Sequence, residues 1–359
     1  MEHIAAASAA ICMSASAHAQ SSVTLYGSSS PSIAYVSNIA GNRSFRANSG
    51  EHRQDNFGFL GTEALGGGLQ AIFRLEGAYF TQTGTQAVNG TLFNSEAYVG
   101  LKTHRGSVTL GRQTDYMYDY LSPVSNGVES QTYSNFHIGN LDHLGKGVQF
   151  NNAVKAEFEP VAGLTFGGLY GFGNVAGDMG QSSNLGAGIR YRYGPFQIAA
   201  AYANQHNVSL STLTATIGIP RLLGQSIASA TFDQESYGVG GTYSIGGWRL
   251  NALITGIHLT TISGSTSTNM HNVDVGLRYA FSPFHSVAVT YTRSTLLAFR
   301  WDQFGVADTY QLSKQTALYA SIISQRAHGA GANAGILAAG GPSSSRLQTM
   351  VFAGIQHAF

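Results

Sequence analysis

The chain of 359 residues is almost neutral and poor in charge: it has 19 Lys and Arg, 18 Asp and Glu, and a formal net charge of +1. Charged residues make up 10% of it, against about 25% in a typical soluble domain. This neutrality argues against a nucleic-acid partner, and the absence of an apolar run of about 18 residues after the start argues against a transmembrane helix. A membrane β-barrel accounts for such a composition, because lipid-facing and lumen-facing side chains alternate along its strands. A soluble β-helix or adhesin is the competing class.

The first residues have the pattern of a secretory signal peptide. An apolar, small-residue stretch is followed by Ala17-His18-Ala19 before Gln20, which is an A-x-A cleavage pattern. Glu2 and His3 stand where Lys or Arg is expected, and an N-terminal helix of the mature protein is the alternative. We therefore predict a signal peptide over 1–19 and a single barrel domain over 20–359, which would contain no cysteine because the only one lies in the leader.

Alternating segments of about ten residues follow along the rest of the chain and predict antiparallel strands. Their number is even, as single-chain bacterial barrels require. The sixteen predicted strands are 22–36, 54–64, 69–80, 92–103, 107–112, 147–158, 162–173, 185–193, 196–204, 236–246, 248–260, 270–282, 285–296, 301–312, 315–325 and 347–359.

Short and long connections alternate between these strands. Turn formers such as Gly66-Gly67-Gly68 and Gly246-Gly247 make the short ones. The long ones are expected at 37–53, 81–91, 113–146, 174–184, 205–235, 261–269 and 326–346, and a short connection near 296–300 takes the same place in the alternation. This asymmetry is typical of an outer-membrane barrel, with tight turns at the periplasm and loops outside. A β-helix would show one fixed repeat period, and none is present.

The last predicted strand ends on the terminal residue Phe359. Every second residue back to Val351 is apolar, small or a histidine. In a closed barrel this strand must pair with the first one, because no strand edge can remain open in lipid. We expect Phe359 in the aromatic girdle at the periplasmic interface, and as a signal read by the barrel-assembly machinery.

Several motifs resemble the general porins of Gram-negative β-proteobacteria. They are SSVTLYG at Ser21–Gly27, FGFLGTEALGGGLQAIFRLEG at Phe57–Gly77, AYVGLKTHRGSVTLGRQTD at Ala97–Asp115, NNAVKAEF at Asn151–Phe158, GLTFGGLYGFGN at Gly163–Asn174 and the closing Phe359. The resemblance covers nearly the whole mature chain. It implies a trimer of sixteen-stranded barrels, a second loop (81–91) that reaches toward a neighbouring subunit, and a third loop that folds into the lumen.

The segment 113–146 occupies the place of that third loop and is the proposed constriction. It carries the acids Asp115, Asp119 and Glu129. A long loop without regular structure is usually functional. The alternative is a mobile external loop.

The barrel wall opposite this loop departs from the family pattern. The resemblance puts basic residues at or near Asn56, Ser95 and Gln149, and all three are neutral here. Arg74, beside Glu76 on the same strand face, and Lys155 are the remaining lumen candidates, while Arg53 and Lys146 lie at strand ends. The sequence therefore predicts weak selectivity tilted toward cations. The strand arginines Arg190, Arg192, Arg249, Arg278 and Arg293 are also expected to face the lumen, because lipid-facing charges are costly.

The resemblance implies an outer-membrane channel for passive diffusion of small hydrophilic solutes and ions. A substrate-specific channel, or a surface-exposed binding or adhesion barrel, is the alternative. No enzyme activity, cofactor or metal is expected, since the histidines are scattered and no helix follows the Gly-rich turns. The expected partners are two further copies in a homotrimer, outer-membrane lipid and lipopolysaccharide, the barrel-assembly machinery, and the solutes themselves.

Overall fold

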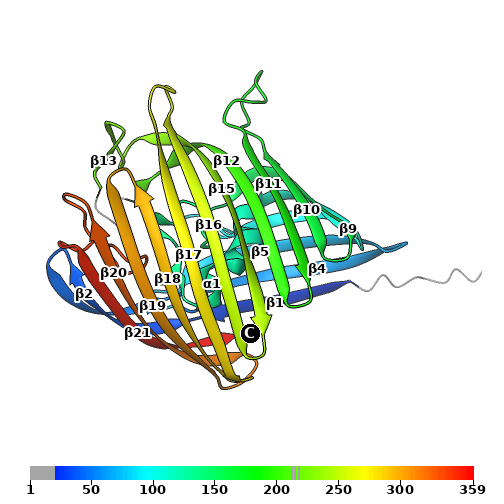
Figure 1. Cartoon of the computed structure of the whole chain (residues 1–359). Helices are drawn as coiled ribbons and strands as arrows, with labels where there is room; N and C mark the ends of the chain where they lie inside the picture. Colours follow the sequence, from blue (N-terminus) through cyan, green and yellow to red (C-terminus); the bar gives the residue numbers. More distant parts are fainter. Residues whose placement is uncertain (1–20, 212, 214–215, 217–218) are drawn as a thin grey trace, which may run out of the picture.

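A computed structural model describes residues 21–211, 213, 216 and 219–359 of the chain. The expected signal peptide, 1–19, lies outside the described residues. The described part forms one antiparallel sheet that closes on itself as a sixteen-stranded barrel. Figure 1 shows the long connections at one end of the barrel and the C-terminus at the other.

Two of the sixteen barrel strands are interrupted, and each is made of two consecutive segments. The strands are β1 (Ser22–Ser29) with β2 (Pro31–Ile39), β3 (Asn42–Ser49) with β4 (Asn56–Gly66), β5 (Leu69–Phe80), β7 (Glu96–Thr103), β8 (Gly106–Gln113), β9 (Phe150–Val161), β10 (Leu164–Gly171), β11 (Asn184–Tyr193), β12 (Phe196–Ser209), β15 (Thr231–Ile245), β16 (Trp248–Thr261), β17 (Ser267–Ser282), β18 (His285–Leu296), β19 (Phe299–Gln311), β20 (Thr316–His328) and β21 (Leu347–Ala358). The short strands β6 (Thr85–Gln86), β13 (Arg221–Leu222) and β14 (Gln225–Ser226) lie in the connections.

The barrel closes between its last and first strands, as the sequence predicts. β21 pairs with β20 on one side and with β1 and β2 on the other. Phe359 and Gly27 exchange two backbone hydrogen bonds of 3.0 Å each, so the terminal residue belongs to the seam. The barrel therefore has no open strand edge at the seam, where unpaired backbone N–H and C=O groups would face lipid.

Side chains alternate between the two faces of the wall. In β17, Asn272 and Asp274 are buried on the inner face, while the alternating residues Val273 and Val275 are exposed on the outer face. The same alternation gives β21 an outer face with Val351 and Ile355. This pattern satisfies a lipid-facing exterior and a polar interior at once.

The expected long connection at 37–53 is wrong for most of its length. β2 extends to Ile39 and β3 begins at Asn42, so only Ala40 and Gly41 form the turn. Both have positive φ (48° and 99°), which a tight two-residue hairpin turn requires. The polar composition of 42–49 resembles a loop, although it pairs with β2.

Arg293 was expected to face the lumen, but it lies on the outer face of the barrel. It shares the outer face of β18 with Val289 and Tyr291, whereas Thr290 and Thr292 point inward and are buried. Arg190, Arg192, Arg249 and Arg278 lie on the inner face of their strands, as predicted.

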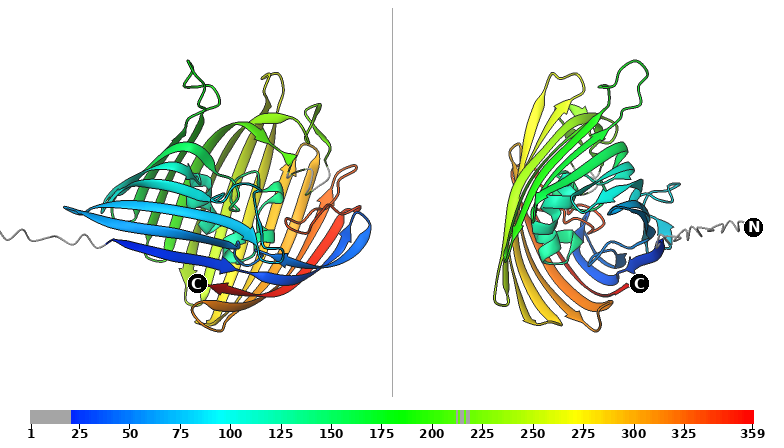
Figure 2. Two further views of the ribbon diagram at one scale, coloured as in Figure 1. Left: turned by 180° about the vertical axis from the view of Figure 1, so that it is seen from behind. Right: turned by 90° about the vertical axis from the view of Figure 1, so that its right-hand side faces the viewer.

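The connection between β8 and β9, residues 114–149, lies inside the ring of strands and is called the lumen loop below (Figure 2). It contains the short helices η1 (Met117–Leu121), η2 (Ser122–Val124), α1 (Asn126–Glu129), η3 (Tyr133–Asn135) and η4 (Ile138–Asn140). None of the helices among the described residues is long and apolar enough to cross a membrane.

Deleting Phe359 is expected to lower the yield of folded, heat-modifiable barrel strongly. The deletion removes both backbone hydrogen bonds to Gly27 and the ring that covers this glycine. Gel mobility with and without heating measures the folded fraction, and His357→Gln, an exposed change on the same strand face, is the matched control. An unchanged folded fraction after the deletion would show that the terminal residue is dispensable for closure.

Candidate functional site

The first half of the lumen loop packs on glycines of the facing wall. Tyr116 and Tyr120 lie against β10 and β11, where a Cβ on Gly167 would overlap the Tyr116 ring and a Cβ on Gly188 would crowd both tyrosines. The Tyr116 hydroxyl donates to the carbonyl oxygen of Ala156 at 2.6 Å. The glycines therefore let the loop lie flat on the wall and keep the remaining lumen open.

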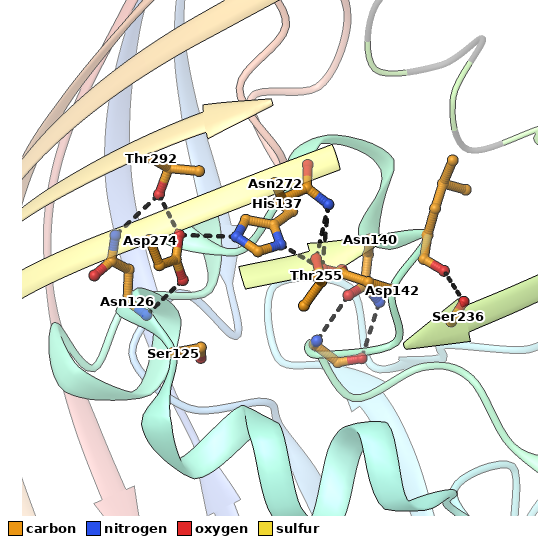
Figure 3. Close-up of polar contacts among 12 residues, drawn as sticks. Ser125, Asn126, His137, Asn140, Asp142, Ser236, Thr255, Asn272, Asp274 and Thr292 are labelled. Carbon is orange, nitrogen blue, oxygen red and sulfur yellow. Dashed lines mark hydrogen bonds and ion pairs between the residues drawn. The ribbon is translucent and has the colours of Figure 1, made fainter. Parts of the chain in front are cut away.

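A buried ionic cluster ties the middle of the loop to the wall (Figure 3). The His137 ring contacts the Asp142 carboxylate through Nδ1 and the Asp274 carboxylate of β17 through Nε2, the latter at 2.8 Å. Asp274 also accepts from the Asn126 backbone N–H at 3.0 Å and from the Thr292 hydroxyl at 2.7 Å. These contacts connect η4, α1 and two wall strands in one network.

His137 carries a positive charge in this cluster. Burial alone would lower its pKa, but the carboxylates of Asp142 and Asp274 outweigh that effect and raise it to about 10. A protonated imidazole donates from both nitrogens, which matches one carboxylate on each side. The loop is thus held by an imidazolium between two acids rather than by a neutral hydrogen bond.

Tyr133 and Ser134 fasten the loop to the side of the barrel opposite the strands that Tyr116 and Tyr120 contact. The Ser134 hydroxyl donates to the Glu51 carboxylate at 2.7 Å, and the Tyr133 backbone N–H donates to the Glu51 carbonyl oxygen at 2.7 Å. The Gln303 amide of β19 donates to the carbonyl oxygen of Ser134 at 3.0 Å. The loop therefore crosses the lumen as a fixed partition that narrows the passage.

The acids expected to line the passage pair with basic residues of the wall or of the loop itself. Asp115 is buried and pairs with His143 at 2.6 Å. Glu129 is buried and pairs with Arg249 at 2.6 Å. Asp119, which is partly exposed, pairs with Lys155, whose ammonium also donates to the carbonyl oxygen of Thr114 at 2.8 Å. The side of the lumen loop that faces the passage therefore presents few acids.

A second ion-pair cluster lies across the passage on β5 and β7. The Arg74 guanidinium reaches Glu76 at 3.1 Å and Glu96 at 3.0 Å, and the Lys146 ammonium, from the end of the loop, contacts both carboxylates. The side chains of Glu76 and Glu96 are 0% and 9% exposed, whereas those of Arg74 and Lys146 are 33% and 13% exposed. Both acids are therefore covered, and Arg74 is the group of this cluster that is most exposed to the water.

The passage beside the loop, called the opening below, has a volume of about 590 Å³. Its lining includes neutral and aromatic loop residues, Tyr118, Ser122, Val128, Gln131 and Tyr133. The formally charged residues that line it are Arg53, Arg74, Lys146, Lys314 and Glu76, four cations against one carboxylate. Arg53 and Lys314 form no ion pair with any other described residue. The opening is therefore positive.

The three neutral positions differ in where they lie. Asn56 lines the opening beside Arg53. Ser95 is buried, and its backbone N–H donates to the backbone carbonyl oxygen of Glu76 at 3.1 Å. Gln149 accepts a hydrogen bond of 2.9 Å from Arg112 and does not line the opening. The structure therefore brings Asn56, Arg74 and Glu76 together at the opening, and leaves Ser95 and Gln149 outside it.

His137 and Lys314 are the residues of this site that the sequence reasoning missed. Lys314 lies in a short turn between β19 and β20, and it lines the same opening as Arg53 only because the barrel closes. Asp142 lies near His137 in the sequence, but the wall partner Asp274 lies 137 positions away, so nothing local indicates that His137 ties the loop to the wall. Asp274 alternates with apolar residues that face outward, so the sequence places its carboxylate inside the barrel, where a charged partner is needed.

Comparison with known proteins places this geometry in a family. A model of the Gram-negative porin family matches residues 5–329. Outer membrane porin protein 32 of Delftia acidovorans is 28% identical, over 98% of this chain and 98% of its own length. An outer membrane porin protein of Bordetella pertussis is 26% identical, over 85% of this chain and 89% of its own.

Solved structures share the fold. An anion-selective porin from Comamonas acidovorans superposes with a TM-score of 0.79 at 23% identity, covering 95% of this chain and 100% of that chain. The trimer form of OmpT, an outer membrane protein of Vibrio cholerae, gives a TM-score of 0.67 at 13% identity, with 94% and 99% covered.

Proposed function

The chain belongs to the Gram-negative porin family and forms an outer-membrane channel for passive diffusion, and on this premise we propose that the channel prefers small anions, which cross it chemically unchanged. The observation that carries the proposal is the set of charges at the opening, where four cations and one covered carboxylate, that of Glu76, line the passage. This anion preference is opposite to the weak cation selectivity that the sequence predicts.

The physical argument rests on the charges that an ion meets inside a narrow passage. A low-dielectric wall focuses the field of the few charges on its surface. Arg74 and Lys146 compensate Glu76 and Glu96, so this cluster is neutral in sum, and its most exposed group is the positive Arg74. Arg53 and Lys314 then add two uncompensated positive charges at the opening. An anion is therefore stabilised there and a cation is repelled.

A related fold agrees with this sign. The porin from Comamonas acidovorans that superposes on the barrel is described as anion-selective. We take this as support for the charge argument, which stands on the residues of this chain.

The channel itself is tested by adding purified protein to a planar lipid bilayer. Spontaneous, ohmic conductance steps are expected, because the lumen loop is fixed beside an opening of about 590 Å³. Protein that inserts but conducts no current would favour a plugged binding or adhesion barrel.

The anion preference should shrink as salt concentration rises. The Debye length is about 10 Å at 0.1 M and about 3 Å at 1 M, so the field of Arg53 and Lys314 reaches less of the passage at high salt. The anion-to-cation permeability ratio, measured at the same tenfold KCl gradient from a low and a high base concentration, tests this. A ratio independent of salt would point to size exclusion rather than charge.

We also propose that three copies of the chain assemble, with the connection 81–95 reaching toward a neighbour. Two of its residues form β6, which pairs with the end of β5, and the rest is largely exposed. Native mass measurement in mild detergent should give three subunits, and cutting back 83–90 should weaken the assembly. A stable monomer that still conducts would refute the trimer without touching the charge argument.

A further inference from the structure

Three arginines gather on the outer surface of the barrel, far from the opening. Arg293 of β18, Arg300 of β19 and Arg326 of β20 all project from the outer face, near the strand ends that lie at the β18–β19 turn and at the start of the long β20–β21 connection. Register places Arg293 opposite Asp302 and Asp302 opposite Arg326. Arginines on this face are costly at mid-bilayer but nearly free of cost near the interface, so their position at the strand ends fits the headgroup level.

One carboxylate organises the cluster from below. Asp302 accepts from Arg293 Nε at 2.7 Å and lies 3.1 Å from Arg300 Nε and 3.2 Å from His328 Nε2. Its side chain is 13% exposed, whereas those of Arg293 and Arg300 are 45% and 42% exposed. Asp302 contacts both arginines through their Nε atoms, so this carboxylate does not occupy their terminal guanidinium nitrogens.

The cluster has a positive excess that the described residues do not neutralise. Three guanidinium groups face one carboxylate, and the side chain of Arg326 forms no ion pair or hydrogen bond with any other described residue. Guanidinium groups bind phosphate oxygens in a bidentate, planar geometry. The arrangement therefore fits an anion with several oxygens.

The surface beside the arginines is hollowed and apolar on one side. A depression of about 500 Å³ is lined by Arg293, Arg326 and His328 together with Tyr291, Phe304 and Leu347. Phe304 lies on the outer face of β19 one step closer to mid-membrane than Asp302, and the exposed Val306 follows it. A ligand that fills this depression needs a charged head at the arginines and a hydrocarbon part along the wall.

We propose that this surface is a binding site for a phosphorylated lipid of the outer leaflet, of the lipopolysaccharide type. Its phosphate lies between Arg293 and Arg326, and its acyl chains lie along Phe304 and Val306. Basic pockets on the outer wall of membrane proteins bind lipid headgroups in this way. The site is independent of ion selectivity in the lumen.

The test is native mass spectrometry of the purified protein titrated with bisphosphorylated lipid A and, separately, with its dephosphorylated form. The wild type should retain the phosphorylated lipid and bind the dephosphorylated form at least about tenfold more weakly, because hydrogen bonds between charged groups are lost. The double variant R293Q/R326Q should lose the same factor, while R43Q, an outward arginine near the turn end of β3, should not. Unchanged heat-modifiable mobility and conductance establish that the variants fold.

Three results would overturn the proposal. Equal binding of phosphorylated and dephosphorylated lipid by the wild type would remove the role of phosphate, whether or not the variant folds. Displacement of the lipid by inorganic phosphate at comparable concentration would make this a site for a free anion. Loss of subunit association in R293Q/R326Q with lipid binding intact would make the cluster part of a subunit interface.

Discussion

Replacing His137 with glutamine is expected to release the lumen loop from the wall and to make the channel close frequently. The substitution removes the positive charge between Asp142 and Asp274, which are both buried. Removing one partner of a buried ion pair typically costs about 3–5 kcal/mol, because the remaining charge is uncompensated. We expect a penalty of that order for the anchored position of the loop.

Single-channel recording measures the effect as the frequency of closures per open channel. His258→Gln is the matched control, since His258 lies on the outer side of β16, where its ring forms a hydrogen bond of 2.8 Å with the side chain of Asn269. Combining His137→Gln with Asp274→Asn removes one of the stranded charges and should recover part of the stability, a coupling that a double-mutant cycle detects. Equal closure frequencies in wild type and H137Q would show that other contacts hold the loop.

The same cluster gives the loop a defined pH range. The pKa of His137 is raised to about 10, so its contribution is complete below its ordinary value near 6.5 and is lost as the pH rises through about 10. Although burial raises the pKa of Asp142, His137 lowers it below its usual range. The contribution of Asp142 is therefore lost only as the pH falls below the ordinary Asp value of about 4. Closures in the wild type should increase above about pH 10, and H137Q should lack this alkaline change.

Reversing the two unpaired charges at the opening is expected to change the ion selectivity most. In the double variant R53E/K314E, two positive charges become negative without stranding a buried carboxylate, because neither residue has an ion-pair partner among the described residues. A unit charge about 4 Å from an ion contributes about 1 kcal/mol in water, roughly a fivefold change in partition. We expect the preference to pass from anions to cations.

The reversal potential in a KCl gradient measures this change. The matched control is R43E/R221E, which reverses the same number of charges at exposed positions outside the opening. A shift of equal size in the control would mean that the overall charge of the protein, rather than the opening, sets the selectivity.

Most of the barrel could be predicted from the sequence because each strand shows its own alternation of outward apolar and inward polar residues. Val273 and Val275 on one side of β17, with Asn272 and Asp274 on the other, state the two faces without any distant information. The segment 42–49 was not recognised as a strand because only two of its outward positions, Phe45 and Ala47, are apolar, which is too few to show a clear alternation. Arg293 was misplaced although parity with Val289 and Tyr291 already put it outside.

The site could be predicted only in part, because loop side chains take their direction from residues far away in the chain. Glu129 turns to the wall to meet Arg249, 120 positions later, and nothing near Glu129 announces this partner. Arg74 and Glu76 were found because they lie on one strand, where spacing fixes the face. The sign of the charge at the opening depends on which group of each pair is covered, and only the folded chain determines that.

The most direct test of the account is the reversal potential of the wild-type channel across a tenfold KCl gradient at low salt and neutral pH. The account predicts a potential of the sign that chloride permeation sets, because Arg53, Arg74, Lys146 and Lys314 line the opening against the single carboxylate of Glu76. A potential of the opposite sign, set by potassium, would contradict it and would mean that acids of the lumen loop reach the passage after all.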